Sequence, residues 1–408
     1  MEILSLFKNT KSSCLLTNMN LFYASFGILT IFLISGGALT NAHRRPCRES
    51  PPGSDDDREL KLVHVVMRHG IRAPVSLYPN DPHQGNDFPP NGRGMITMKG
   101  IEGVYELGKI LRQRFDKFLG SRFNISEFKA ESTGVERAQA TIMAVNAGLW
   151  PPAKEQRFSK DFAWMPVPVF MTNLDDDMLL LVAKDCPQYN FERKRIEESA
   201  EVQAELEKYK DMMAIIQEKS GQTMKTFDDI GDIYATMLAE KSYGLDLPDW
   251  VLPHFDRMET ATAFSFVIKA YNDKMQRLKG GVLLKKILSD WRSKVAGTLT
   301  PKMFLYGGHD STIANLLSAL KVFDPQVPNY AMSIILQMSF DKSTKQHGIE
   351  IFTKNSTAEY IQHQLPGCEM FCPLEDIIKL TSNVIPVDWE AECATDDENY
   401  TAPPFEGP

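Results

Sequence analysis

The chain has 408 residues, of which 43% are hydrophobic and 24% are charged, a composition typical of a globular protein with a sizeable core. Its 45 Lys and Arg residues against 53 Asp and Glu residues give a formal net charge of −8. No general positive field therefore attracts nucleic acid, and we expect no nucleic acid partner. An anionic ligand has to be held by local groups.

The N-terminal segment predicts entry into the secretory pathway. Residues 21–34 are almost uninterrupted apolar sequence, preceded by Lys8 and Lys11 and followed by the small residues of "SGGALTNA". An uncleaved membrane anchor is the alternative, but the apolar run is short for a span, and the basic "HRRPCR" after it disfavours a lumenal domain on that side. We expect a signal peptide over 1–42, a secreted or lysosomal location, and no membrane span once it is removed.

Sequons and cysteines agree with export. Asn-X-Ser/Thr triplets begin at Asn124, Asn355 and Asn399. The cysteines that follow the apolar run are odd in number: Cys47, Cys186, Cys368, Cys372 and Cys393. Four of them can form two disulfides in an oxidising compartment, with three connectivities open. Cys47 is the exception, because it lies in a flexible leader over 43–59 that is rich in Pro, Gly and Asp.

The first folded block, residues 60–175, alternates strand-like and helix-like segments. Residues 63–67 are continuously apolar, as in a strand covered on both faces. Apolar residues then recur every three or four positions over 101–118, which predicts an amphipathic helix. "FKAEST" predicts a second strand, and "GVERAQATIMAVNAGL" predicts a helix that ends at "WPP".

The remaining chain divides into a helical block and a return to mixed structure. Residues 176–295 are charged and largely helical in pattern, which predicts an inserted α-helical domain. In 296–393, "MFLYGGHDSTIANLLSAL" predicts strand, glycine turn and helix, and "AMSIILQMSF" with "GIEIFTKN" predicts an antiparallel pair. An acidic tail occupies 394–408. The fold class is therefore α/β, a sheet domain with helices on both faces and a helical insertion.

Positive charge gathers where the first buried strand ends, in "RHGIRAP". Arg68, His69 and Arg72 follow the apolar run directly. Ligands of open α/β sheets bind beyond the carboxyl ends of strands, and the planar forks of two arginines present paired donors to phosphate oxygens. We expect a pocket for a tetrahedral dianion, with Gly70 removing a side chain that would crowd it. Surface charges or helix caps are the alternative reading.

Two further strand ends carry related side chains. "YGGHD" places His309 and Asp310 between a strand and a helix, although Asp310 can also be explained as a plain helix N-cap. "STGVERAQAT" places Arg137 in the first turn of a helix, where a cation is disfavoured unless an anion lies nearby. The three strand ends together predict one anion site.

At these residues the chain resembles the histidine acid phosphatases, in their prostatic and lysosomal branch. "RHGIRAP" fits the RHGxRxP signature, and the distal "HD" fits the second motif. The likeness continues through "YPNDP", "YELGKILRQRF", "LPGCEMFCPLE" and "VIPVDW", over roughly residues 60–393. The resemblance implies a phosphoglycerate-mutase-like sheet domain and hydrolysis of phosphate monoesters without a metal or other cofactor.

The resemblance also implies roles for individual residues. His69 matches the nucleophile that becomes a phosphohistidine, and Asp310 matches the proton donor to the leaving alcohol. The residues that match phosphate-contacting positions are Arg68, Arg72, Arg137 and His309.

The cysteines and one aromatic residue are also read through the resemblance. It implies that Cys186 pairs with Cys393 and Cys368 with Cys372. A further cysteine pair common in this branch is missing, and Phe170 stands where relatives carry a dimer-contact histidine. Whether the protein forms a homodimer is therefore left open.

Elementary chemistry agrees with these roles. Imidazole attacks phosphorus only through an unprotonated ring nitrogen, and neighbouring arginines lower its pKa. Asp310 has to carry a proton when the ester bond breaks, which low pH favours.

We therefore predict a secreted or lumenal acid phosphatase that acts on small phosphomonoesters, with phosphoproteins and lysophospholipids among the candidates. An exported binding protein that has lost turnover is the alternative. Four residues of the loops and the insertion can either touch substrate or face water, and we expect water: His83, Arg93, His254 and Arg257.

Overall fold

A computed structural model of the chain describes residues 57–355 and 359–403. The predicted signal peptide, nearly all of the leader with Cys47, and the last residues of the acidic tail lie outside this range. Within the described ranges, no helix has both the length and the apolar character needed to cross a bilayer.

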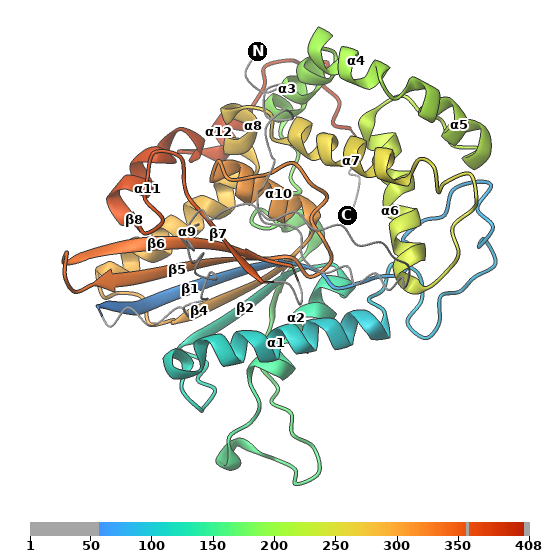
Figure 1. Cartoon of the computed structure of the whole chain (residues 1–408). Helices are drawn as coiled ribbons and strands as arrows, with labels where there is room; N and C mark the ends of the chain where they lie inside the picture. The colour runs from blue at the N-terminus through green and yellow to red at the C-terminus, as the bar shows by residue number, and fades with distance from the viewer. Residues whose placement is uncertain (1–56, 356–358, 404–408) are drawn as a thin grey trace, which may run out of the picture. The chain divides into compact units, whose positions relative to one another are not determined.

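A mixed sheet forms the centre of the described fold (Figure 1). Its strands follow the order β3-β2-β4-β1-β5-β6-β7, and β8 pairs with β6. The first four run parallel, whereas β5, β6 and β7 continue the sheet in antiparallel pairs, including the predicted β5–β6 pair. The strands are β1 Arg58–Arg68, β2 Phe128–Thr133, β3 Phe170–Thr172, β4 Met303–Gly308, β5 Ser333–Asp341, β6 Gln346–Lys354, β7 Tyr360–His363 and β8 Cys372–Pro373.

The parallel register brings three strand ends to the same edge of the sheet. Arg68, the last residue of β1, lies opposite Gly308, the last residue of β4. On the other side of β4, Ser132 of β2 lies opposite Gly307. Residues that directly follow β1, β2 and β4 are therefore neighbours, although the chain separates them by up to about 240 positions.

Helices α1 (Met98–Leu119) and α2 (Glu136–Leu149) cover one face of the sheet (Figure 1). The Thr97 hydroxyl caps α1 by accepting a bond of 2.9 Å from the Gly100 amide. The two helices touch backbone to backbone, because a Cβ on Gly108 would lie 2.2 Å from the Val145 carbonyl oxygen. Both elements match the helices predicted from the sequence.

Helices α9 (Gly280–Val295), α10 (Asp310–Ala319) and α11 (Leu374–Leu380) cover the opposite face (Figure 1). Helix α9 lies within the stretch predicted as the helical insertion. Its apolar side chains nevertheless pack on the sheet, where Trp291 shares a core with Leu62 of β1. We propose that the helical domain ends before α9.

The other helices of the predicted insertion form most of a separate core, with Ile216, Ile230 and Met258 among its fully buried residues, and Ala314 of α10 also belongs to it. The helical character predicted for this block is confirmed. The helices are α3 Pro187–Glu197, α4 Ala200–Glu207, α5 Lys210–Ser220, α6 Phe227–Tyr243, α7 Phe255–Lys269 and α8 Asp273–Leu278. The remaining helical segments are α12 Trp389–Cys393 and the 3-10 turns Lys154–Gln156, Leu174–Asp176 and Ser382–Val384.

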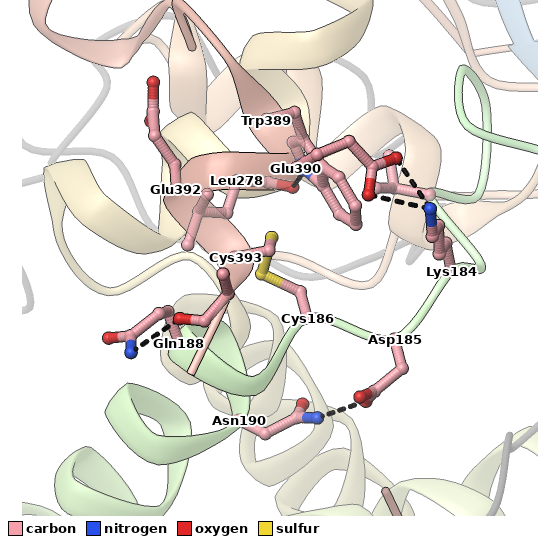
Figure 2. The surroundings of a disulfide bond; sticks show 12 residues. Lys184, Asp185, Cys186, Gln188, Asn190, Leu278, Trp389, Glu390, Glu392 and Cys393 are labelled. Carbon is pink, nitrogen blue, oxygen red and sulfur yellow. Dashed lines mark hydrogen bonds and ion pairs between the residues drawn. A yellow bond between two sulfur atoms is a disulfide. The ribbon is translucent and has the colours of Figure 1, made fainter. Parts of the chain in front are cut away.

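Two disulfides pair the cysteines as the family resemblance predicts. Cys368 and Cys372 close a short loop. Cys186 and Cys393 join positions 207 residues apart and so tie α12 to the start of α3 (Figure 2). Beside this bond the Trp389 indole N–H donates to the Leu278 carbonyl at 2.9 Å. The C-terminal segment is therefore fastened to the helical domain by both covalent and polar contacts.

Candidate active site

The structure brings the six predicted site residues together at the carboxyl ends of β1, β2 and β4. Five of them are buried, with exposed fractions of 1–8%: Arg68, His69, Arg72, Arg137 and His309. Asp310 is the more open member, since 31% of its side chain is exposed. Buried arginines beside one partly exposed carboxyl group are suited to bind an anion that enters from solvent.

His69 directly follows β1 and is fixed at both its main chain and its ring. Its amide donates to the Gly308 carbonyl at 3.0 Å, and its carbonyl accepts from the Ala331 amide at 3.0 Å. The ring Nδ1 lies 2.9 Å from the Gly70 carbonyl oxygen. Because a carbonyl can only accept, Nδ1 carries the hydrogen, and in the neutral ring Nε2 holds a free lone pair.

The electrostatics of the site keep His69 neutral. Burial lowers its pKa well below the ordinary histidine value, and the nearby positive charges of Arg68 and Arg137 lower it further. The imidazole consequently retains an unprotonated nitrogen in acidic solution, which a nucleophile requires.

Asp310 forms an ion pair with Arg68, whose Nη2 lies 2.9 Å from Oδ2. Burial alone would raise the pKa of this carboxyl, but the positive charge of Arg68 and the hydrogen bond from the Ser311 amide outweigh it and lower the pKa. Asp310 is the first residue of α10 rather than its N-cap, which is His309. Its Oδ1 accepts a bond of 2.8 Å from the Ser311 amide.

His309 lies at the same edge of the sheet as His69 and Asp310. Its ring centre lies 5.4 Å from that of His69. Nε2 lies 3.0 Å from the Thr133 hydroxyl, at the end of β2. Burial first, and Arg137 next, lower the pKa of His309 to about 3, so the ring is neutral. Nδ1 is buried and has no hydrogen-bond partner among the described residues. Thr133 lies within the segment "STGVERAQAT", but the sequence analysis did not single it out.

Arg137 and Arg72 complete the positive cluster. Arg137 is the second residue of α2, as the sequence predicts, and its carbonyl accepts from the Thr141 hydroxyl at 2.7 Å. The same hydroxyl accepts from the Gly70 amide at 3.0 Å, which links α2 to the loop after β1. Burial and Arg72 together lower the pKa of Arg137 to about 10. Positive charges that repel one another in this way are stabilised by a bound dianion.

Gly70 has a different role from the one expected. A Cβ at this position would lie 2.9 Å from side-chain atoms of Ile96 and Val104 and 3.0 Å from the Gly100 carbonyl oxygen. These groups belong to α1 and the turn before it. The expectation that Gly70 clears the anion pocket is therefore wrong, because the glycine allows close approach of α1.

Three of the four residues left between substrate and solvent have side-chain partners of their own, whereas the buried Nδ1 of His254 has no hydrogen-bond partner among the described residues. Arg257 forms two contacts of 2.9 Å with Asp211, Arg93 donates to the Gln84 carbonyl, and the His83 ring contacts the Asp246 carbonyl. His254 precedes α7 as its N-cap residue. Over residues 57–355 and 359–403, no group of three or more His, Cys, Asp or Glu side chains is arranged to hold a metal ion.

Comparison with known proteins agrees with this geometry. The family model of the histidine phosphatase superfamily (branch 2) matches residues 59–352. Venom acid phosphatase Acph-1 of Apis mellifera is 35% identical over 344 residues, which cover 82% of this chain and 88% of the relative. Lysosomal acid phosphatase of Homo sapiens is 32% identical over 342 residues, covering 82% and 80% of the two chains.

A solved structure shares the fold. Hafnia alvei phytase in complex with myo-inositol hexakis sulphate superposes with a TM-score of 0.65 at 15% identity, over 83% of this chain and 99% of the phytase. At that identity the likeness concerns the fold alone. The sequence relatives and the family model go further, and the resemblance predicted from the motifs is confirmed: the chain belongs to branch 2 of the histidine phosphatase superfamily.

Proposed function

We propose that the protein is an acid phosphatase that hydrolyses phosphate monoesters through a phosphohistidine on His69. The observation that carries the proposal is the position of His69, which is buried among arginines with Nδ1 bonded to the Gly70 carbonyl. Nε2 is thereby the nitrogen available to a substrate. The membership of the phosphatase family supports the same reaction.

The reaction would proceed in two displacements. In the first, Nε2 forms a bond to phosphorus while the bond between phosphorus and the ester oxygen breaks, and Asp310 gives its proton to the departing alcohol. In the second, water attacks phosphorus and passes a proton to Asp310, while the phosphorus–nitrogen bond breaks. Inorganic phosphate is released and both side chains return to their starting state.

The positive cluster would bind the phosphoryl oxygens and stabilise their charge in the transition state. Arg68, Arg72 and Arg137 supply forked donors to a group whose negative charge is spread over three oxygens. His309 would supply one more. If the Thr133 hydroxyl donates to Nε2 of His309, the hydrogen resides on Nδ1, and this nitrogen can donate to phosphate. Thr133 is then a positioning residue.

A bound dianion would change the protonation of Asp310. In the free protein Arg68 pairs with the carboxyl and holds its pKa down. A phosphate dianion neutralises part of that positive charge and adds negative charge beside Asp310, and both effects raise its pKa. Binding of substrate in acidic solution would therefore load the proton that the leaving group needs.

An oxidising, acidic compartment suits this chemistry, and we propose a secreted or lysosomal location. The two disulfides support it. Asn124 and Asn399, which begin predicted sequons, are exposed. Relatives include a venom and a lysosomal acid phosphatase. We propose small phosphomonoesters as substrates. Phe170 is 54% exposed on the edge strand β3, and the formation of a homodimer stays open.

Release of phosphate from p-nitrophenyl phosphate at pH 5 tests the proposal. The wild-type protein should turn over without added metal and in the presence of a chelator, whereas His69→Ala should lose activity and keep its melting temperature. A wild-type protein that binds vanadate but releases no phosphate would be a binding protein. That result would refute the proposed hydrolysis.

A further inference from the structure

A loop between α10 and β5 contacts the candidate active site, and no sequence motif marks it. The Pro328 carbonyl accepts from Arg68 Nη1, and the Ala331 amide donates to the His69 carbonyl at 3.0 Å. The Met332 carbonyl accepts from the Arg68 amide at 2.9 Å. Three main-chain contacts thus fasten this loop to the end of β1. A side chain between them has a position determined by the catalytic residues.

The loop also carries backbone strain next to the site. Ala331 adopts a φ of 61°, a left-handed conformation that is unfavourable for a residue with a Cβ. The residue before it is Tyr330. The contacts of Ala331 and Met332 with His69 and Arg68 hold the strained turn in place, and the turn sets the direction of Tyr330.

The Tyr330 ring lies against two of the six site residues. The Arg68 guanidinium carbon is 4.3 Å from the ring centre, within the range of a cation–π contact. The ring centre of His69 is 5.8 Å away. Tyr330 therefore borders the cluster of site residues on the side of Arg68.

The Tyr330 hydroxyl has unused hydrogen-bonding capacity. The oxygen is buried, yet it has no hydrogen-bond partner among the described residues. A buried polar group without a partner costs free energy, so such groups usually serve a ligand or a water molecule. The O–H of a neutral phenol is a hydrogen-bond donor. An oxygen of a phosphoryl group is a matching acceptor.

We propose that Tyr330 is a further phosphate-contacting residue, whose hydroxyl donates to a phosphoryl oxygen while its ring holds the Arg68 guanidinium in position. This inference rests on the proposed function, since it assigns one more donor to the same site. The hydroxyl and the ring make separable contributions. Tyr330→Phe removes only the donor, and Tyr330→Leu removes the ring face as well.

The test compares inhibition of p-nitrophenyl phosphate hydrolysis by vanadate in the wild type and in Tyr330→Phe. A hydrogen bond to a charged group corresponds to a loss of about 10- to 100-fold in affinity. We expect the inhibition constant to rise by that factor and kcat/KM to fall by at least as much. The melting temperature without ligand should stay equal or increase, because a buried unpaired hydroxyl has been removed. A structural role would lower it instead.

Tyr306→Phe is the matched control. Tyr306 is also buried, its hydroxyl also lacks a partner within the described part of the chain, and its ring stacks on Phe304 of the same strand rather than on the site. This variant should keep the wild-type inhibition constant.

An unchanged inhibition constant in Tyr330→Phe would overturn the inference while leaving the proposed function intact, provided that the wild type hydrolyses the substrate. A loss confined to Tyr330→Leu would overturn the assignment of the hydroxyl in the same way. Absence of both hydrolysis and vanadate binding in the wild type would overturn the proposed function and this inference together.

Discussion

Asp310 has to meet two opposing requirements. Its ion pair with Arg68, at 2.9 Å, favours the carboxylate in the free protein. As the proposed general acid it has to hold a proton when the ester bond breaks. Both are satisfied if the proton arrives together with the anion, because a bound dianion raises the pKa that Arg68 lowers. In the proposed mechanism, activity would then depend on acid because ligand binding loads the proton onto Asp310, and not because the free site already holds it.

Sulfate binding tests this coupling, since sulfate is a tetrahedral dianion that does not itself titrate near pH 5. For the wild type we expect the affinity to increase as pH falls from 7 to 5, by up to about tenfold per pH unit for one proton taken up. Asp310→Asn should show a flatter dependence. Calorimetry in two buffers of different ionisation enthalpy counts the protons directly. The same pH dependence in both proteins would assign the proton to another group.

The leaving group provides a second test of Asp310. Asp310→Asn should slow phosphorylation of His69 strongly for alkyl phosphates, whose alcohols leave poorly without a proton. The loss should be much smaller for p-nitrophenyl phosphate, and the two losses should differ by up to about 10²–10⁴-fold, the usual contribution of a general acid. Single-turnover measurements isolate this step. Equal losses with a lowered melting temperature would instead indicate that the bond to the Ser311 amide is what matters.

At the residue scale, the sequence predicts the charged and titratable side chains of the site, but it does not predict the uncharged side chains that position them. His69 and Asp310 stand in recognisable motifs at strand ends, and the register of β1 with β4 explains why they meet. Thr133 and Tyr330 have no such signal, because their contacts depend on how β2 and the loop before β5 approach the site. Gly70 was misread since the sequence does not show which way its missing side chain would point.

At the scale of elements, the segment between β1 and α1 docks on α6. The Thr236 hydroxyl donates to the Ser76 carbonyl at 3.2 Å, and the Tyr243 hydroxyl donates to the Pro89 carbonyl at 2.6 Å. Between these contacts two acidic side chains, Asp81 and Glu240, are almost fully buried. Tyr78 is the other titratable group beside them. A buried carboxyl beside another carboxyl is more stable when it is protonated.

Glu240→Gln tests this carboxyl pair. Burial, and then Asp81, raise the pKa of Glu240 from 4.5 to about 8. The folded state therefore binds the proton more tightly than the unfolded state. The resulting stabilisation is complete below pH 4.5 and is lost as pH rises to about 8. We expect the melting temperature of the wild type to fall over this window and that of Glu240→Gln to fall less, so that the variant is the more stable protein at pH 8.

Glu198→Gln, at an exposed position at the end of α3, is the control for the general loss of a carboxylate. It should follow the wild-type pH dependence. Parallel curves for all three proteins would mean that Glu240 does not hold a proton at neutral pH.

The sequence predicts helices with a clear apolar period well, but it does not predict which elements they pack against. The spacing of Val104, Leu107 and Leu111 fixes the buried face of α1. Helix α9 was assigned to the insertion because it continues a charged helical stretch, whereas Trp291 and its neighbours pack on the sheet. Contacts such as Asp81 with Glu240 join residues far apart in the chain, so no local pattern announces them.

At the scale of the whole described fold, the chain forms three hydrophobic cores. Two lie on the faces of the sheet, and the third is formed mainly by helices α3 to α8. The last helix, α12, belongs to the third core through Trp389 and Cys393. The disulfide to Cys186 therefore closes a long loop that contains most of the helical domain and the second half of the sheet.

Removal of this disulfide should destabilise the protein more than removal of the short one. Cross-links that close longer loops restrict the unfolded chain more, and loss of a native disulfide typically costs about 2–5 kcal/mol. We expect the double variant Cys186→Ala/Cys393→Ala to melt several degrees lower. Cys368→Ala/Cys372→Ala, with a separation of 4 residues, is the matched control and should change less. A larger loss in the control would show that local packing outweighs the long loop.

The central claim of this account is that His69 carries the phosphoryl group between substrate and water. Rapid mixing with a ³²P-labelled monoester, an alkaline quench and peptide mapping measure it directly, because phosphohistidine survives alkali and is lost in acid. The account predicts label on the peptide that contains His69, stable in alkali, acid-labile, and absent from His69→Ala. Label on another residue, an adduct that withstands acid, or steady turnover by His69→Ala would contradict it.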